Sequence, residues 1–307
     1  MSFNDNVTLD TSQVSSGGGG GGAPGGMVVG GGIGGIVILI LTLLFNGVFG
    51  GSGDPTGGLS GIDSSQVAAA GTQSSNAFSQ CRTGADANRD TTCRIIGTVN
   101  SVQAFWTAEL PRFGKQWQPT KTVLYNGQIQ SACGTASNQV GPFYCPLDKR
   151  VYIDASFFQI LQDQFGSSGG PLAQEYVVAH EYGHALQDQL GLLGRAQQGP
   201  QGAQSGSVRT ELMADCLGGV WAHHATTVND EDTGTPFLKP LSTTDIKDAL
   251  SAASAVGDDR IQQATQGRVN PESWTHGSAE ARQRWFLQGY KTGDLNECDT
   301  FSAATVE

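Results

Sequence analysis

The stretch AQEYVVAHEYGHALQDQL, residues 173–190, holds two of the five histidines of this 307-residue chain. Pro171 suits the first position of a helix, and Gly191 suits the position just after its end. Between them, apolar and small residues recur at spacings of three and four, which is the period of a helix. The sequence therefore predicts a helix over residues 171–190 that carries His180 and His184.

The spacing of these two histidines has a chemical meaning. Residues four apart lie on one face of a helix, so His180 and His184 can bind the same ion, and they lie at the border of the apolar stripe, where we expect a cleft. Glu181 is near enough to take a proton from a water that the ion activates. This H-E-x-x-H pattern is typical of zinc peptidases. Alternatively, the two histidines border the core of the protein and form hydrogen bonds with backbone groups or carboxylates, without binding a metal.

A second segment, SVRTELMADCLGGVWAHH at residues 207–224, predicts another helix with Ser207 as its N-cap. Glu211 and Asp215 share one face of it, while its other faces are apolar. Such a helix is buried, and buried carboxylates need partners. A metal and a histidine N–H would satisfy both, and Gly218 and Gly219 would let the motif helix pack closely.

A catalytic zinc ion needs three protein ligands and one open position. The candidates for the third ligand are Glu211, Asp215, His223, His224 and His276. Glu211 is favoured because its longer side chain reaches further, whereas Asp215 is suited to orient a ligand histidine. His223 and His224 are expected to complement a helix dipole. The sequence thus predicts one zinc ion per chain, bound by His180, His184 and Glu211.

The N-terminal part of the chain has a different composition from the rest. Twenty of the 44 glycines precede residue 62, and the first basic residue is Arg82. We expect a disordered glycine-rich segment at 1–26, a transmembrane helix at 27–49, a flexible linker at 50–75 and a globular domain at 76–307. In the domain, residues 149–154 predict a strand and residues 155–165 a helix, so the fold class is α+β and mostly helical with a small sheet.

Charge and cysteine content limit the compartment and the partners. The net charge of −11 argues against nucleic acid as a partner. The six cysteines form no C-x-x-C pair. We expect disulfides Cys81–Cys93 and Cys133–Cys145, each spanning twelve residues, and Cys216–Cys298, although spacing alone allows fifteen pairings. Disulfides beyond a membrane span predict an extracytoplasmic domain on a single-pass membrane protein, and six free thiols would indicate the cytosol.

Four stretches together resemble the bacterial membrane-anchored neutral zinc metallopeptidase family: HEYGHALQ, ELMADCLGGVWA, GPFYCPLDKRVYID and WTHGSAEARQRWFLQGY. The resemblance runs from about residue 98 to residue 301 and includes the glycine-rich N-terminus, although this chain lacks basic residues before its apolar run. It implies a zincin-like fold related to gluzincins. It also implies His180, His184 and Glu211 as zinc ligands, Glu181 as the base and Asp215 as the residue that orients a ligand.

The same resemblance brings His276 into consideration. The segment T-H-G-S-A-E-A-R is similar to one that supplies an oxyanion donor in related membrane metallopeptidases, with Arg282 as a helper. Alternatively, His276 is a capping or surface histidine ahead of a helix that Ser278 caps.

The expected function is therefore hydrolysis of peptide bonds in a peptide or protein substrate. The competing interpretations are a catalytically idle zinc-binding domain and a metal-free cell-surface interaction domain. The sequence does not indicate an oligomeric state.

Overall fold

The computed structural model describes residues 2–17, 77–137 and 140–307 of the chain. The predicted transmembrane helix at 27–49 and linker at 50–75 lie outside these residues. Within the described ranges, no helix is long and apolar enough to cross a membrane.

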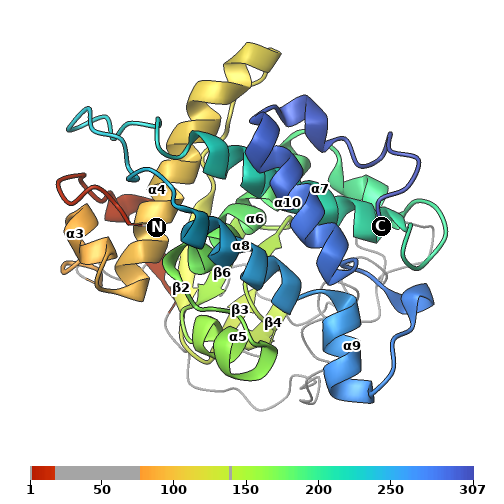
Figure 1. The fold of residues 1–307 in the computed structure, drawn as a ribbon. Coiled ribbons are helices and arrows are strands. Elements are labelled where there is room, and N and C mark those ends of the chain that lie inside the picture. The colour runs from red at the N-terminus through yellow and green to blue at the C-terminus, as the bar shows by residue number, and fades with distance from the viewer. Residues whose placement is uncertain (1, 18–76, 138–139) are drawn as a thin grey trace.

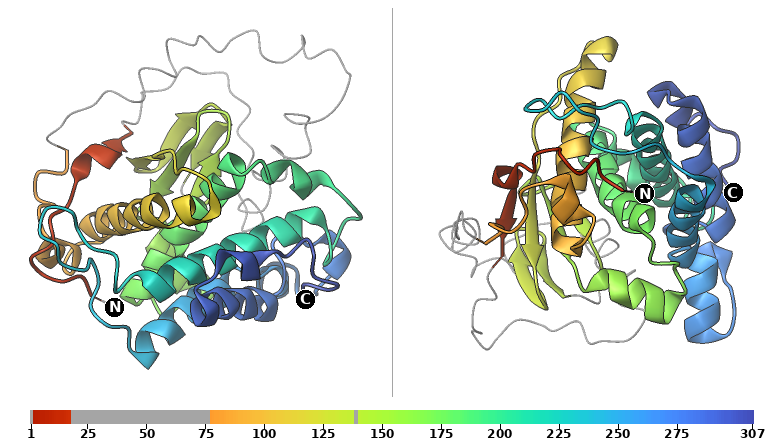
Figure 2. Two further views of the ribbon diagram at one scale, coloured as in Figure 1. Left: turned by 90° about the horizontal axis from the view of Figure 1, so that it is seen from above. Right: turned by 60° about the vertical axis from the view of Figure 1, so that its left-hand side comes forward.

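The secondary structure is mostly helical, with short strands gathered on one side of the helices (Figure 2). The α-helices are α3 (Gly84–Ala87), α4 (Thr91–Glu109), α5 (Phe157–Phe165), α6 (Pro171–Gln189), α7 (Gly206–His224), α8 (Thr243–Ala255), α9 (Asp258–Gln266) and α10 (Ala279–Thr292). The strands are β1 (Val14–Ser16), β2 (Lys121–Tyr125), β3 (Gln128–Ser131), β4 (Gly134–Ser137), β5 (Phe143–Cys145) and β6 (Arg150–Asp154). Short 3-10 helices are η1 (Thr11–Gln13), η2 (Leu110–Phe113), η3 (Leu193–Gln197), η4 (Pro271–Ser273) and η5 (Leu295–Cys298).

The main sheet has four strands in the order β1-β2-β6-β5. Strands β1, β2 and β6 run parallel, and β5 pairs antiparallel with β6. Strands β3 and β4 form a separate antiparallel pair. The predicted α+β, mostly helical class with a small sheet is confirmed, and the strand and helix predicted from residue 149 onward are β6 and α5.

Helix α6 lies at the centre of the domain (Figure 1), in contact with α4, α7, α8 and strands β5 and β6. Residues 172–187 are all buried, so every face of α6 is covered, and not only the apolar stripe that the sequence predicts. Several polar side chains of α6 have hydrogen-bond partners inside the protein. Tyr182, for example, hydrogen-bonds the Thr122 hydroxyl at 2.9 Å and the Thr120 carbonyl at 3.1 Å. Helix packing on every side therefore holds the motif residues in fixed positions.

Helix α7 packs against α6 on one side and against α10 on the other. Gly218 faces α6, where a Cβ atom would make ordinary contacts with Ala179 and the His180 backbone. Gly219 faces α10 instead, and a Cβ atom there would collide with the Phe286 carbonyl. The expectation that both glycines serve the motif helix is thus wrong for Gly219, which allows the close approach of α10.

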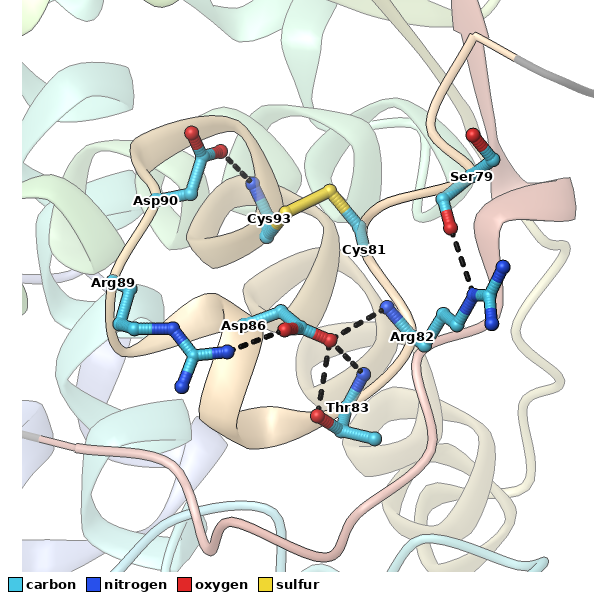
Figure 3. The surroundings of a disulfide bond; sticks show 8 residues. All are labelled: Ser79, Cys81, Arg82, Thr83, Asp86, Arg89, Asp90 and Cys93. Carbon is cyan, nitrogen blue, oxygen red and sulfur yellow. Dashed lines mark hydrogen bonds and ion pairs between the residues drawn. A yellow bond between two sulfur atoms is a disulfide. The ribbon is translucent and has the colours of Figure 1, made fainter.

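The three predicted disulfides are present, and they pair all six cysteines. Cys81–Cys93 ties the loop before α3 to the first turn of α4, and Figure 3 shows its surroundings. There, Asp90 caps α4 by accepting the Cys93 N–H at 2.9 Å. Cys216–Cys298 joins α7 to η5, 82 residues further along the chain. Each bond restricts the unfolded chain and so stabilises the domain.

The N-terminal residues 2–17 are packed on the domain, so the expected disorder of segment 1–26 is wrong for this part. Glycine is the most frequent residue in segment 1–26, but several apolar residues precede the glycine run. The side chains of these residues are buried: Phe3, Val7, Leu9 and Val14. Residues 14–16 add β1 to the edge of the sheet beside β2. Long-range burial, which composition does not report, orders the segment.

Phe3 provides a test of this docking. Its ring is fully buried against Gly97 of α4. Phe3→Ala should lower the free energy of unfolding by about 3–5 kcal/mol, the usual cost of removing a buried phenyl ring. Chemical denaturation measures it, with Asn6→Ala at an exposed position of the same segment as the control. Equal stability of the two variants would mean that the segment is not docked.

Candidate metal and active site

The two histidines of α6 meet Glu211 of α7 in the interior of the domain. His180 Nε2 lies 3.2 Å from one Glu211 carboxylate oxygen, and His184 Nε2 lies 3.4 Å from the other. The ligand atoms of all three residues lie within 4.8 Å of one another. All three side chains are buried. Of the five candidates for a third ligand, the structure groups Glu211 with the two motif histidines.

These three side chains could hold a zinc ion. Zinc binds nitrogen and oxygen ligands at about 2.0–2.1 Å, so two ligand atoms of a tetrahedron lie about 3.3–3.4 Å apart. Each Nε2 atom lies close to this distance from one oxygen of the Glu211 carboxylate, 3.2 Å for His180 and 3.4 Å for His184, and the ligand atoms of the three residues lie within 4.8 Å of one another. Two imidazoles and one carboxylate are also a donor set that catalytic zinc ions use. The residues present therefore fit the metal that the sequence predicts.

The far side of each imidazole is held by a hydrogen-bond acceptor. His180 Nδ1 lies 2.7 Å from Asp215 Oδ1, and His184 Nδ1 lies 2.8 Å from Gln187 Oε1. Gln187 is fixed in turn, because its amide nitrogen donates to the Thr210 carbonyl at 2.7 Å. With a proton on Nδ1, each ring directs the lone pair of Nε2 towards Glu211, as metal-binding histidines require.

Asp215 of α7 is a fully buried carboxylate surrounded by donors from two other helices, α6 and α10. Arg282 of α10 donates from Nε to Oδ2 at 2.8 Å and from Nη2 to Oδ1 at 2.9 Å. The Tyr176 hydroxyl donates to Oδ1 as well, beside the contact from His180. Against the opposing effect of burial, Arg282 and His180 lower the pKa of Asp215 to about 2. Asp215 is therefore a charged anchor for the His180 ring, and Arg282 is primarily its counter-ion.

The electrostatic field at the ligand atoms favours positive charge. Burial opposes protonation of His180, but the Asp215 and Glu211 carboxylates raise its pKa to about 10. Burial also opposes ionisation of Glu211, yet His184 and His276 hold its pKa well below the usual range. The group of side chains thus stabilises a cation between the imidazoles and Glu211. A metal that binds there must displace a proton from His180.

Glu181 lines a pocket next to the ligand group, together with His180, Glu211, His276 and Arg282. The remaining walls are mostly apolar: Val140, Gly141, Pro142, Phe157, Tyr176, Val177, Val256 and Ile261. Burial raises the pKa of Glu181 above its ordinary value. A carboxylate with a raised pKa is a stronger base than an ordinary one, which suits a general base.

His276 lines the same pocket and is positioned by Asp258 of α9. One Asp258 oxygen accepts the backbone N–H groups of residues 275, 276 and 277 at 2.7–3.0 Å. The other lies 3.5 Å from His276 Nδ1, and the Thr275 hydroxyl lies 2.9 Å from the same atom. Although burial opposes it, the Glu211 and Asp258 carboxylates raise the pKa of His276. His276 is thus a buried pocket residue rather than a surface histidine, and Ser278 caps α10 as predicted.

His223 and His224 lie outside the group. His223 Nδ1 lies 2.7 Å from the Tyr290 carbonyl, and His224 Nε2 lies 3.0 Å from the Gly293 carbonyl. Both lie in the last turn of α7, the position expected for complementing its dipole, and they also contact the end of α10. Sequence reasoning did not find Gln187 or Asp258. Gln187 lies three residues after His184 on the same helix, so its contact with that histidine could have been predicted from helical spacing. Asp258 lies 18 residues before His276 on another element, and no sequence pattern predicts their contact.

Comparisons with known proteins found a family model and relatives in bacteria. The family model described as "Putative neutral zinc metallopeptidase" matches residues 2–301. The uncharacterized protein Rv2575 of Mycobacterium tuberculosis is 62% identical over 229 residues, which cover 75% of this chain and 77% of that protein. The uncharacterized protein YpfJ of Escherichia coli K12 is 40% identical over 220 residues, or 70% of this chain and 73% of that protein. No solved structure matches.

The ligand group gives a prediction about metal content. Glu211→Ala should nearly abolish zinc binding, because it removes one of three ligands, whereas Gln187→Ala should weaken binding by about 10–100-fold by releasing the His184 ring. Zinc per chain after dialysis against competing chelators measures both. Glu280→Ala, at an exposed position of α10, is the control. If zinc survives Glu211→Ala but is lost with His276→Ala, the site has three histidine ligands instead.

Proposed function

Since this chain belongs to the neutral zinc metallopeptidase family, we propose that it hydrolyses peptide bonds as a zinc-dependent endopeptidase. One observation carries the proposal: the ligand atoms of His180, His184 and Glu211 lie within 4.8 Å of one another, and Glu181 lines the pocket beside them. A domain that only binds zinc needs no second buried carboxylate, such as Glu181, beside the metal ligands. Without a metal, the Nε2 atoms of His180 and His184 could contact the Glu211 carboxylate only through shared protons.

The proposed reaction assigns a role to the three ligand residues, to Glu181 and to His276. Bound at His180, His184 and Glu211, a zinc ion would supply Lewis-acid activation of water and of the substrate carbonyl. Glu181 takes the proton of the attacking water and passes it to the leaving amine. His276 donates a hydrogen bond to the oxyanion that develops on the former carbonyl. Asp258 keeps His276 at the pocket wall through its contacts with the backbone of residues 275–277.

The proposed compartment is extracytoplasmic. All six cysteines are paired, and disulfides persist on the oxidising side of a membrane. The apolar residues 27–49 support attachment to that membrane. The proposed substrate is a peptide or an unfolded protein that can enter the pocket in an extended form.

The role of Glu181 is tested by replacing its carboxylate with an amide of the same size. Glu181→Gln should reduce hydrolysis of an unfolded protein substrate by about 10²–10⁴-fold, since the amide cannot accept the proton. Zinc content should stay near that of the unsubstituted protein, because Glu181 is not a ligand. Full activity in this variant would overturn the mechanism, and loss of zinc would make Glu181 structural.

The role of His276 gives a separate prediction. His276→Ala should lower kcat by about 10²–10³-fold, the usual cost of one lost oxyanion donor, and should leave zinc in place. His223→Ala, which removes an exposed contact with α10 at the far end of α7, serves as the matched histidine control and should retain activity. Steady-state kinetics on a fluorogenic peptide, with metal analysis of the same samples, separates the two outcomes. Equal activity of the two variants would remove His276 from the mechanism.

A further inference from the structure

The N-terminal segment, residues 2–17, is held by its backbone as well as by its buried side chains. Asn88 accepts the Phe3 N–H at 2.8 Å and donates to the Phe3 carbonyl at 3.0 Å. Asn100 of α4 makes the same pair of bonds with Asp10, at 2.9 and 3.0 Å. Two asparagines thus each bind both backbone groups of one residue in the segment. Contacts of this kind fix the position and the direction of the segment.

The domain surface is shaped to receive this segment. At Gly97, a Cβ atom would lie 2.7 Å from the Phe3 ring, so only glycine leaves room for that ring. At Gly84, a Cβ atom would collide with the Asn4 carbonyl. Asn4 also bonds the 236–237 backbone, through its N–H to the Phe237 carbonyl and its amide to the Pro236 carbonyl. The receiving surface therefore comes from α3, α4 and a loop more than 220 residues away in sequence.

Two chains of contacts connect the segment with the motif helix α6. At one end, Arg94 donates to the Asn88 carbonyl at 3.1 Å and to the Gln174 side chain at 2.9 Å, and Gln174 is part of α6. At the other end, Gln103 donates to the Gln13 side chain at 2.7 Å and accepts the Thr120 N–H at 2.8 Å.

The Thr120 carbonyl then accepts the Tyr182 hydroxyl, and Tyr182 lies between Glu181 and His184 in the motif. The segment is thus connected to the helix that carries the candidate active site, and the family similarity includes it.

This docking has a topological consequence. Residue 17 and residue 77 belong to one packed body, and the apolar residues 27–49 lie between them in the chain. A chain that crossed a membrane once between residues 17 and 77 would place the segment and the domain on opposite sides. The docked segment and the single crossing predicted from the sequence therefore exclude each other.

We propose that residues 2–17 are a permanent structural part of the domain formed by residues 77–307 and lie on the same side of the membrane. The surface formed by α3, α4, the loop at 236–237 and the edge of β2 is the site that binds this segment of the same chain. The proposal does not depend on peptidase activity, because it rests on the contacts of the segment alone.

A cysteine pair in the full-length chain tests the proposal in the native membrane. Ser15 and Val123 are paired residues of the parallel strands β1 and β2. Neighbouring strands lie about 4.7–4.9 Å apart, within the Cα separation of about 4.4–6.8 Å that a disulfide accepts. Ser15→Cys with Val123→Cys should form a fourth disulfide within one chain. Asp5→Cys with Val123→Cys is the matched control and should not form one, because Asp5 contacts Asn88 and Lys239 at the other end of the segment.

Labelling of intact cells with a membrane-impermeant maleimide gives the second measurement. Single variants Asp5→Cys and Glu280→Cys place one exposed thiol on the segment and one on the domain. The proposal predicts the same labelling of both thiols, whichever compartment holds the domain. Opposite labelling, with no 15–123 disulfide, would overturn it in favour of a single crossing. A 15–123 disulfide that links two chains would overturn it in favour of a segment supplied by a second copy.

Discussion

The buried contact between Arg282 and Asp215 is the interaction on which the candidate site depends. A carboxylate with no exposure to water needs a counter-charge, and the guanidinium provides it through two hydrogen bonds. With its charge balanced, Asp215 can also accept from Tyr176 and from the His180 ring. One ionic contact thus connects α6, α7 and α10 and orients a predicted zinc ligand.

The contact between Arg282 and Asp215 depends on the close packing of α7 and α10. Gly219 of α7 and Gly289 of α10 have no Cβ atoms, and a Cβ at either position would collide with the backbone of the other helix. Because α10 lies so near α7, Arg282 reaches Asp215 with its guanidinium still buried. Helix α6 is enclosed on all sides, which gives its two histidines little freedom to turn away from Glu211. Catalytic groups need this kind of support, since small displacements of a ligand or base are costly.

The N-terminal segment extends the same principle to a part of the chain that is distant in sequence. It adds β1 to the sheet, fills the space beside Gly97 and binds side chains that contact α6. The domain is therefore made of two pieces, residues 2–17 and 77–307, with the glycine-rich and apolar residues between them. Phe3 and Val7 are buried in the core formed by residues 77–307, so residues 2–17 are part of the folded domain.

The sequence by itself determined the local features of this protein: the helical placement of His180 and His184, their shared face and the β6 strand. It also favoured the disulfides between cysteines twelve residues apart, although spacing alone did not exclude other pairings. These follow from helical and strand periodicity and from short loops, which act over a few residues. The tertiary structure decided which of five candidate residues joins the histidines, that Asp258 positions His276, and that residues 2–17 are ordered. Each of these depends on contacts between segments far apart in the chain, where a side chain's partner is set by helix packing and burial rather than by its neighbours in sequence.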